Sequence, residues 1–271
     1  MNRRRILFGV KAGWNEAIAT VLDRDRFDCA AIAFDEAAGR YDAVVPLTLD
    51  QQAELRARPG AFGGRYLVPD GATESLCHDK RRFNRFLIGE GFRDLVPAMI
   101  RPRLASPPFV LKRRRDEFGA RSHVVPDAAA LVPLASLLDD PAYFAQALVP
   151  GRTEFTSHLL AVDGEVRHQL HIAYEMAGEA CIRGGAARPL ASRVLAASPA
   201  PGLAERIAGL LRYTGVGCLN YKMAGGRPQL FEFNPRFGSS LTRDVNAFLD
   251  AYLAALDTPR RARAAALETA V

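Results

Sequence analysis

The sequence predicts an α/β protein in which a short N-terminal unit with a parallel sheet precedes a larger part built on antiparallel strands. First, apolar runs alternate with helix-like segments across residues 6–68, as is typical of parallel strands joined by crossover helices. Second, Asp163-Gly164 separates two apolar runs at 156–162 and 166–173, which predicts a tight hairpin. Third, runs at 217–223 and 229–234 flank the turn-forming segment 224–228, which predicts another hairpin.

The N-terminal unit is expected to span residues 1–73. Its strands are predicted at residues 6–10, 29–34, 41–46 and 65–68, and its helices at 15–22 and 49–57. The segment Gly9 to Gly13 after the first strand lacks the Gly-x-Gly-x-x-Gly spacing, so no dinucleotide site is expected there. The main part is expected to span 74–258, with helices near 80–87, 203–211 and 245–256, and an Arg- and Ala-rich tail to follow at 259–271.

Composition narrows the class of protein. With 271 residues, 49% of them apolar, the chain can bury a substantial core. No apolar run is long enough to cross a bilayer, and the start lacks the apolar segment of a signal peptide, so we expect a cytoplasmic protein without a membrane partner. The four cysteines contain no Cys-x-x-Cys pair, which favours free thiols.

The net charge of +6 raises the question of a nucleic-acid partner. The arginines and lysines occur in separate short clusters, and no basic stretch is interleaved with aromatic residues. A platform on which bases could stack is therefore not indicated. We do not expect nucleic acid to be a partner, and an enzyme that handles anions would explain part of the excess charge.

The strand predicted at 229–234 carries the strongest chemical signal. Alternate side chains of a strand share a face, so Glu232 and Asn234 are expected on one face and Phe231 and Phe233 on the other. Pairing the two runs across a five-residue loop would place Met223 opposite Gln229.

The same pairing adds a third ligand to this polar face. It places Asn220 opposite Glu232, beside Asn234. Carboxylate and amide oxygens are ligands that hard cations prefer. The hairpin therefore predicts a metal site made of Asn220, Glu232 and Asn234.

Two lysines are candidates for binding an anion. Lys80 opens the helix predicted at 80–87, directly after Asp79. Lys112 ends the apolar strand predicted at 108–112, where a charge is costly to bury unless an anion meets it. The following loop contains Gly119 and reaches Ser122, and we interpret it as a flap over phosphates.

Residues 232–236, which read Glu-Phe-Asn-Pro-Arg, resemble the final metal-binding strand of the ATP-grasp superfamily. That strand carries Glu-x-Asn, often continued as Asn-Pro-Arg. Asp79-Lys80 followed by Val96-Pro97 is similar to a second family motif. The resemblance implies an ATP-grasp domain with two lobes and antiparallel sheets, which binds ATP and Mg²⁺. Asn220 departs from the family's usual Asp or Glu, although carbamoyl phosphate synthetases place Gln there.

Residues 146–156 carry a further resemblance. Family members read Gln-Glu-x-Ile-x-Gly-x-Glu-Tyr-Thr in this place, and this chain has Gln146, Ala147, Leu148, Val149, Pro150, Gly151 and then Glu154-Phe155-Thr156. The resemblance implies that Gln146 to Val149 form the hinge that meets adenine through backbone groups. It also implies that Glu154 accepts hydrogen bonds from the ribose, as in D-alanine–D-alanine ligases.

Three arginines are candidates for the chemical step. The family often has a cation near residues 182–189 that meets the transferring phosphate, and Arg183 and Arg188 are both candidates. Arg236 lies directly beyond the metal strand, where the family meets phosphate or substrate anions. Lys80 and Lys112 would contact the phosphates of ATP.

The resemblance implies an ATP-dependent carboxylate–amine ligase that releases ADP and phosphate and takes a small carboxylate and an amine as substrates. A carboxylate–thiol ligase, an ATP-grasp kinase acting on a hydroxyl, and a nucleotide-binding module without turnover are the alternatives. The sequence does not fix either substrate or the oligomeric state, and a homodimer is compatible with it.

Overall fold

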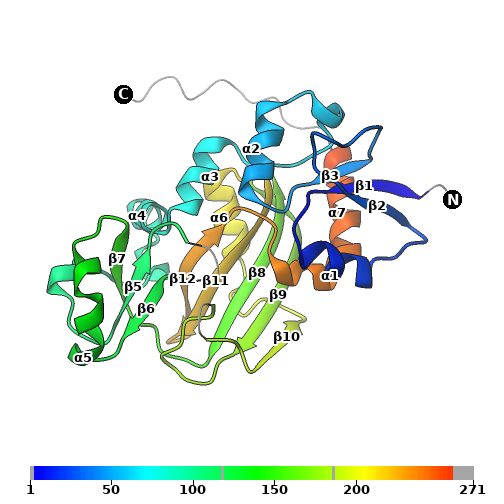
Figure 1. Cartoon of the computed structure of the whole chain (residues 1–271). Coiled ribbons are helices and arrows are strands. Elements are labelled where there is room, and N and C mark those ends of the chain that lie inside the picture. Colours follow the sequence, from blue (N-terminus) through cyan, green and yellow to red (C-terminus); the bar gives the residue numbers. More distant parts are fainter. Residues whose placement is uncertain (1–2, 117–118, 185–186, 259–271) are drawn as a thin grey trace.

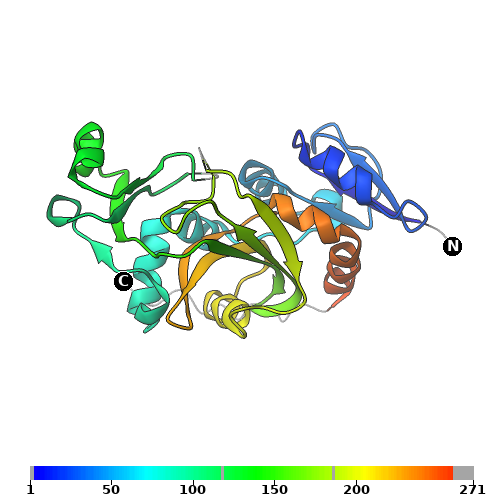
Figure 2. The same ribbon diagram turned by 90° about the horizontal axis from the view of Figure 1, so that it is seen from below.

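The computed structural model describes residues 3–116, 119–184 and 187–258. Its strands lie in three sheets that follow one another across the molecule (Figures 1 and 2). The predicted tail at 259–271 lies outside the described residues. Within the described residues, no helix is long and apolar enough to cross a bilayer.

The N-terminal sheet is three-stranded and parallel, in the order β2-β1-β3. It consists of β1 (Arg4–Phe8), β2 (Phe27–Ala31) and β3 (Ala43–Val45), with helices α1 (Trp14–Val21) and α2 (Leu49–Ala57). Helix α2 begins where the sequence predicts because Thr48 and Gln51 form a capping box.

The predicted fourth strand at 65–68 is not a strand. Its backbone instead meets single partners, including Tyr252, whose hydroxyl accepts a hydrogen bond from the Leu67 N–H at 2.7 Å.

The central sheet has five antiparallel strands in the order β10-β9-β8-β11-β12. They are β8 (Thr153–Val162), β9 (Glu165–Glu175), β10 (Ala191–Leu195), β11 (Gly215–Ala224) and β12 (Arg227–Asn234). The predicted Asp163-Gly164 turn joins β8 to β9, and both residues have positive φ, 49° and 88°, which favours Asp and Gly there.

The β11–β12 hairpin differs from its prediction near the turn. Its loop consists of Gly225 and Gly226 alone, since Ala224 pairs with Arg227, and Met223 lies opposite Pro228 rather than Gln229. A β-bulge beside Asn220 then shifts the register by one residue. The predicted pairing of Asn220 with Glu232 is therefore present, although the predicted five-residue loop and the pairing of Met223 with Gln229 were wrong.

Phe231 is the extra residue of this bulge, because Tyr221 pairs with Leu230 while Asn220 pairs with Glu232. The prediction that Phe231 and Phe233 share the apolar face is consequently wrong. Phe233 is buried in the core, whereas Phe231 lines a cavity on the opposite side.

The third sheet is a four-stranded antiparallel sheet in the order β4-β7-β5-β6. Its strands are β4 (Met99–Ile100), β5 (Phe109–Arg113), β6 (Ser122–Val125) and β7 (Tyr143–Ala147), with the short helix α5 (Ala128–Leu131). Helices α3 (Gly71–His78) and α4 (Lys80–Gly89) link the N-terminal unit to this sheet. Asp79 caps α4 by accepting a hydrogen bond from the Arg82 N–H.

The two faces of the central sheet have different cover. One face packs against α4 and α6 (Leu203–Leu211), through core residues such as Leu159, Leu219 and Phe233. On β8 the opposite face is divided between Leu160 and Val162, which join a core with helix α7 (Val245–Asp257), and the polar residues nearer its start. The polar stretch is left open toward the four-stranded sheet and forms a cavity wall.

Candidate functional site

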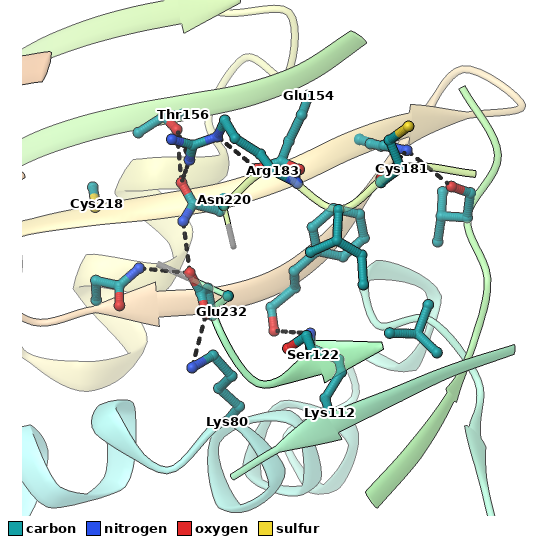
Figure 3. Close-up of a pocket in the computed structure, with 18 of the residues that line it drawn as sticks. Lys80, Lys112, Ser122, Glu154, Thr156, Cys181, Arg183, Cys218, Asn220 and Glu232 are labelled. Atoms are coloured by element: carbon teal, nitrogen blue, oxygen red, sulfur yellow. Dashed lines mark hydrogen bonds and ion pairs between the residues drawn. The ribbon is translucent and has the colours of Figure 1, made fainter. Parts of the chain in front are cut away.

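One cavity lies between the central sheet and the four-stranded sheet, with walls from both (Figure 3). Its wall contains 14 of the 15 residues that the sequence singles out: Lys80, Lys112, Gly119, Ser122, Gln146, Ala147, Leu148, Val149, Glu154, Arg183, Asn220, Glu232, Asn234 and Arg236. Arg188 is the exception: it is exposed and does not belong to the described wall. Of the two arginine candidates, the structure therefore places only Arg183 at the cavity.

The central sheet supplies its polar side chains in cross-strand rows. In the middle row, Asn220 pairs with Thr156 on one side and with Glu232 on the other. In the next row, Cys218 pairs with His158 and with Asn234. This ladder brings residues from three strands onto one face, because directly opposite residues of antiparallel strands share a face.

Glu232 lies at the centre of a dense hydrogen-bond cluster. Its Oε1 accepts hydrogen bonds from the side-chain amides of Asn220 at 2.7 Å and Asn234 at 2.8 Å, and its Oε2 lies 3.2 Å from the Lys80 ammonium. Burial alone would raise the pKa of this carboxyl, but Lys80, Lys112 and the two amides lower it to about 2. Glu232 is therefore ionised at neutral pH.

The side chains of Glu232, Asn220 and Asn234 fit a magnesium ion whose remaining ligands are phosphate oxygens and water. Among the described residues, no three His, Cys, Asp or Glu side chains gather into a metal cluster. Magnesium sites nevertheless commonly use one or two carboxylates and complete their shell with substrate phosphates and water. The Glu232 carboxylate and the amide side chains of Asn220 and Asn234 match that type of site.

Lys112 enters the cavity from the opposite sheet. Its Nζ donates to Gln146 Oε1 and to the carbonyl of Phe231, both at 3.3 Å. Burial lowers the pKa of Lys112 to about 8, and the Glu232 carboxylate partly offsets that shift. Lys112 thus connects the two sheets near the Glu232 carboxylate. A bound anion would favour the charged form of this lysine.

Arg183 connects Glu154 to the row that contains Thr156 and Asn220. Its Nε donates to Glu154 Oε1 at 2.9 Å, and its Nη2 donates to Thr156 Oγ1 at 2.9 Å and to Asn220 Oδ1 at 3.1 Å. These three partners are visible together in Figure 3. Burial raises the pKa of the Glu154 carboxyl, and the nearby guanidinium opposes that shift.

The loop between β5 and β6 lies close to the Arg183 backbone. Gly119 has a positive φ of 63°, and a Cβ built on it would lie 3.0 Å from the Arg183 carbonyl oxygen. Glycine therefore suits both the backbone conformation and the close approach. Residues 117–118 of this loop lie outside the described residues, while the Asp116 carbonyl accepts a hydrogen bond from Lys80 Nζ at 2.6 Å.

The segment from Gln146 to Gly151 closes one end of the cavity. Gln146 donates through Nε2 to the Pro97 carbonyl at 3.0 Å, and the Ala147 N–H donates to the Ala98 carbonyl at 2.8 Å. The Gly151 N–H donates to the Glu179 carbonyl at 3.2 Å. Both flanks of the segment are thus fixed.

The other end of the cavity is formed by the loop after β12. His158 Nε2 and Ser240 Oγ lie 2.7 Å apart, and the buried His158 Nδ1 has no hydrogen-bond partner among the described residues. A Cβ on Gly238 would approach His158 Cε1 to 2.5 Å, so only glycine permits this packing. Burial lowers the pKa of His158 to about 3, which keeps the imidazole neutral.

The sequence interpretation missed several wall residues, including Thr156, His158, Lys222, Phe231 and Ser240. For Thr156 and His158 a signal existed, since both follow Glu154 at two-residue steps in a strand and so share its face. The alternation of Cys218, Asn220 and Lys222 gave a similar signal for Lys222. Phe231 gave none, because a bulge placed it in the cavity.

The arrangement suits a ligand with several negative charges. Five cationic side chains, Lys80, Lys112, Arg183, Lys222 and Arg236, border the cavity, against the two carboxylates Glu154 and Glu232. Lys80 and Lys112 lie on either side of Glu232, which balances them only in part. Such a cluster can hold a polyphosphate together with a divalent cation.

Neither a protein-family model nor a curated protein matches this sequence. Solved structures do match the whole fold. D-alanine–D-alanine ligase from Bacillus anthracis, in complex with ATP, superposes with a TM-score of 0.61 at 17% identity, covering 94% of this chain and 97% of that one. The ATP-grasp ligase PsnB, in complex with a minimal precursor, gives a TM-score of 0.62 at 12% identity, covering 94% and 99%.

The chain has the ATP-grasp fold. An L-amino acid ligase from Bacillus licheniformis agrees, with a TM-score of 0.63 at 14% identity over 96% of this chain and 76% of that one. The predicted fold class, with parallel and antiparallel sheets, is thus confirmed. In ATP-grasp terms, the cavity lies between the two lobes, and the β11–β12 hairpin carries the Glu-x-Asn strand.

Proposed function

We propose that this ATP-grasp protein is an ATP-dependent carboxylate–amine ligase that releases ADP and orthophosphate. The observation that carries the proposal is the cluster around Glu232. One cavity joins an ionised carboxylate and two amides, suited to Mg²⁺, with Lys80 and Lys112, suited to phosphates. The similar solved structures named above are those of ligases, and they support the reaction class.

The nucleotide would lie along the central sheet, with its base at Gln146 to Val149 and its triphosphate at Glu232. This orientation places Glu154 at the ribose, since Glu154 lies on the strand that directly follows the 146–151 segment. Lys80 and Lys112 would contact phosphate oxygens, and Gly119 and Ser122 would cover them. Backbone groups of Ala147 to Val149 would read the base, so the side chain of Ala147 matters little.

Mg²⁺ would be held by Glu232, Asn220 and Asn234. When bound, the ion would supply positive charge that offsets the negative charge developing during phosphoryl transfer. In the present arrangement the amide nitrogens of both asparagines face Glu232. Rotation of these amides would turn their oxygens toward a cation.

The protein's part in the reaction would be positioning and charge neutralisation. A substrate carboxylate oxygen attacks the γ-phosphorus, the bond to the bridging oxygen breaks, and ADP leaves with that electron pair. Arg183 would stabilise the transferring phosphoryl group, and Arg236 would orient the carboxylate. An amine then attacks the acylphosphate carbon, and orthophosphate leaves as the amine loses a proton.

The experiment is a screen of amino acids and small carboxylic acids with Mg-ATP and hydroxylamine. Hydroxylamine intercepts an acylphosphate as a hydroxamate even when the natural amine is unknown. We expect carboxylate-dependent hydroxamate together with ADP and orthophosphate. A persistent phosphorylated product without hydroxamate would favour a kinase, and ATP binding without turnover would favour a nucleotide-binding module.

A further inference from the structure

Lys222 is a buried lysine that neither the metal site nor the phosphate contacts use. It extends from β11 into the cavity wall and is only 2% exposed. Its Nζ donates to three backbone carbonyls, those of Val149 at 3.3 Å, Glu179 at 3.1 Å and Cys181 at 3.2 Å. An ammonium has three N–H donors, so these bonds use its full capacity.

The three carbonyls belong to two different segments. Val149 lies in the segment proposed to meet the base, whereas Glu179 and Cys181 lie in the loop that leads to Arg183. Two backbone hydrogen bonds run beside this contact, from Gly151 to Glu179 and from Met176 to Arg152. Lys222 thus ties both segments to strand β11 of the central sheet.

The connection continues to the metal row through two residues of chain. Cys181 accepts from Lys222, and Arg183, two residues later, reaches Glu154, Thr156 and Asn220 with its guanidinium. Hydrogen bonds and the short chain segment from Cys181 to Arg183 therefore connect Val149 to Asn220. Such linked contacts can couple two parts of a site, because a shift at one part changes the contacts at the other.

Burial of this ammonium is costly, because transfer of a charge out of water is only partly repaid by neutral carbonyl partners. A methionine has nearly the same length and would fill the strand position without that cost. The charge is therefore explained by what it holds in place rather than by packing alone. What it holds in place is the relative position of Val149 and the loop before Arg183.

We propose that Lys222 is a positioning residue that couples the binding of the nucleotide base to the placement of Arg183 at the phosphates. The proposal rests on the proposed function for the nucleotide as ligand and for the place of Arg183 at its phosphates. Lys222 contacts neither the base nor the phosphates in this account. It acts through the Val149 and Cys181 carbonyls.

Lys222→Met should weaken Mg-ADP binding by about tenfold or more and also lower turnover, because it releases both segments. Arg183→Met should chiefly lower turnover. The double variant should turn over no more slowly than Arg183→Met alone, since Lys222 acts on turnover through Arg183. Lys222→Arg, which keeps the charge and its donors, should retain more affinity than Lys222→Met.

The readouts are Mg-ADP affinity by calorimetry, turnover in the hydroxamate assay, and iodoacetamide labelling of Cys181 by mass spectrometry. Labelling of Cys181 should rise in Lys222→Met without nucleotide, while labelling of Cys29 should not change. Lys11→Met is the matched control, a lysine-to-methionine change in the N-terminal unit, and should leave Mg-ADP affinity unchanged. Should Lys222→Met melt below the assay temperature, Lys222→Gln carries the same comparison.

The outcomes separate the two proposals. If the parent protein does not bind Mg-ADP, the proposed function and this inference both fail. If the parent binds Mg-ADP but Lys222→Met binds it equally well, only the coupling is overturned. Additive losses of turnover in the double variant, or Cys181 labelling that stays at the parent's level, would also overturn it.

Discussion

At Glu232, hydrogen bonds and charge together hold a carboxylate ionised where burial alone would favour its protonation. Its partners Lys80 and Lys112 would otherwise repel each other across the cavity. The same carboxylate is thus suited to two tasks, the balancing of two lysines and the binding of a cation. A variant that removes its charge should affect both.

Glu232→Gln should reduce turnover by about 10²–10³-fold, a typical loss when one charged group at a reacting centre is removed. Binding of ATP without metal should persist or strengthen, because the cavity becomes more positive. The measurement is ATP affinity with and without Mg²⁺, together with turnover. Turnover equal to that of the parent would contradict the metal assignment.

Lys112→Ala should weaken nucleotide binding, because the buried ammonium faces the expected phosphates and no other lysine enters from the four-stranded sheet among the described residues. Arg236→Ala should instead leave ATP affinity nearly intact and lower turnover. Calorimetry and initial rates on both variants test this split. Equal ATP affinity in Lys112→Ala and the parent would show that this lysine is misassigned.

His158 makes stability depend on pH. Burial lowers its pKa to about 3, whereas an exposed histidine in the unfolded chain has a pKa of about 6.5. Between these values the unfolded chain binds a proton that the folded protein does not, so stability falls as pH falls through this range.

When the pH is lowered from about 7.5 to about 5, the free energy of unfolding should therefore fall less in His158→Gln than in the parent. Urea unfolding at both pH values measures the difference. His168 and His171, whose pKa values burial also lowers, remain in both proteins, and their contribution cancels in the comparison. Equal slopes would contradict the buried, neutral state of His158.

At the scale of elements, β11 and β12 depend on a close contact between Gly217 and Phe233. A Cβ on Gly217 would lie 2.4 Å from the Phe233 ring. That ring is 1% exposed and contacts Tyr213 edge-on, with centroids 4.8 Å apart. The ring cannot move aside without disturbing the core on the face away from the cavity.

Gly217→Ala should therefore destabilise the protein by roughly 1–3 kcal/mol, the usual cost of overpacking a core. Gly209→Ala is the control, because it lies within helix α6 and a Cβ there meets nothing within 4 Å. It should stabilise by about 0.4–1 kcal/mol. Thermal melts of both variants measure the difference: the melting temperature should fall in Gly217→Ala and rise in Gly209→Ala.

Much of the element order could be predicted from local pattern, since hairpin turns and helix caps are encoded in neighbouring residues. Helix α2 lies at its predicted residues, and the predicted Asp163-Gly164 turn joins β8 to β9. What could not be predicted depends on partners distant in sequence. Residues 65–68 look like a strand yet pair with single groups such as the Tyr252 hydroxyl, and the bulge at Phe231 reverses the side on which that ring lies.

In the candidate site, too, the residues marked by a local pattern could be predicted, and those that depend on distant partners could not. Residues whose chemistry stands out in a strand, such as Glu232 and Lys112, could be found because a charge in an apolar run needs an explanation. Lys222 has the same character, but its partners are backbone carbonyls that no sequence pattern marks. The choice between Arg183 and Arg188 required the structure, which places only Arg183 in the cavity wall.

At the scale of the whole molecule, helix α7 joins the end of the described chain to its beginning. Its Phe248, Leu249 and Tyr252 belong to one core with Ile6 and Phe8 of β1. The Tyr252 hydroxyl also donates to the Val44 carbonyl at 2.9 Å. The N-terminal unit therefore shares its core with the rest of the protein.

Tyr252→Phe should cost about 1–3 kcal/mol, because it leaves the buried Leu67 N–H without its hydroxyl partner. Calorimetry should show a lower melting temperature and still one transition, since a shared core favours cooperative unfolding. Tyr41→Phe, which removes an exposed hydroxyl contact, should change the melting temperature little. Two separate transitions in the parent would contradict the shared core.

This closure also sets an order of events on the ribosome. Strand β1 leaves the exit tunnel before α7, because the helix that covers its apolar residues is made some 240 positions later. Until then Ile6 and Phe8 have no α7 to pack against, and an exposed apolar sheet is prone to associate with other chains. We expect nascent chains that stop before α7 to bind chaperones more than chains that include it.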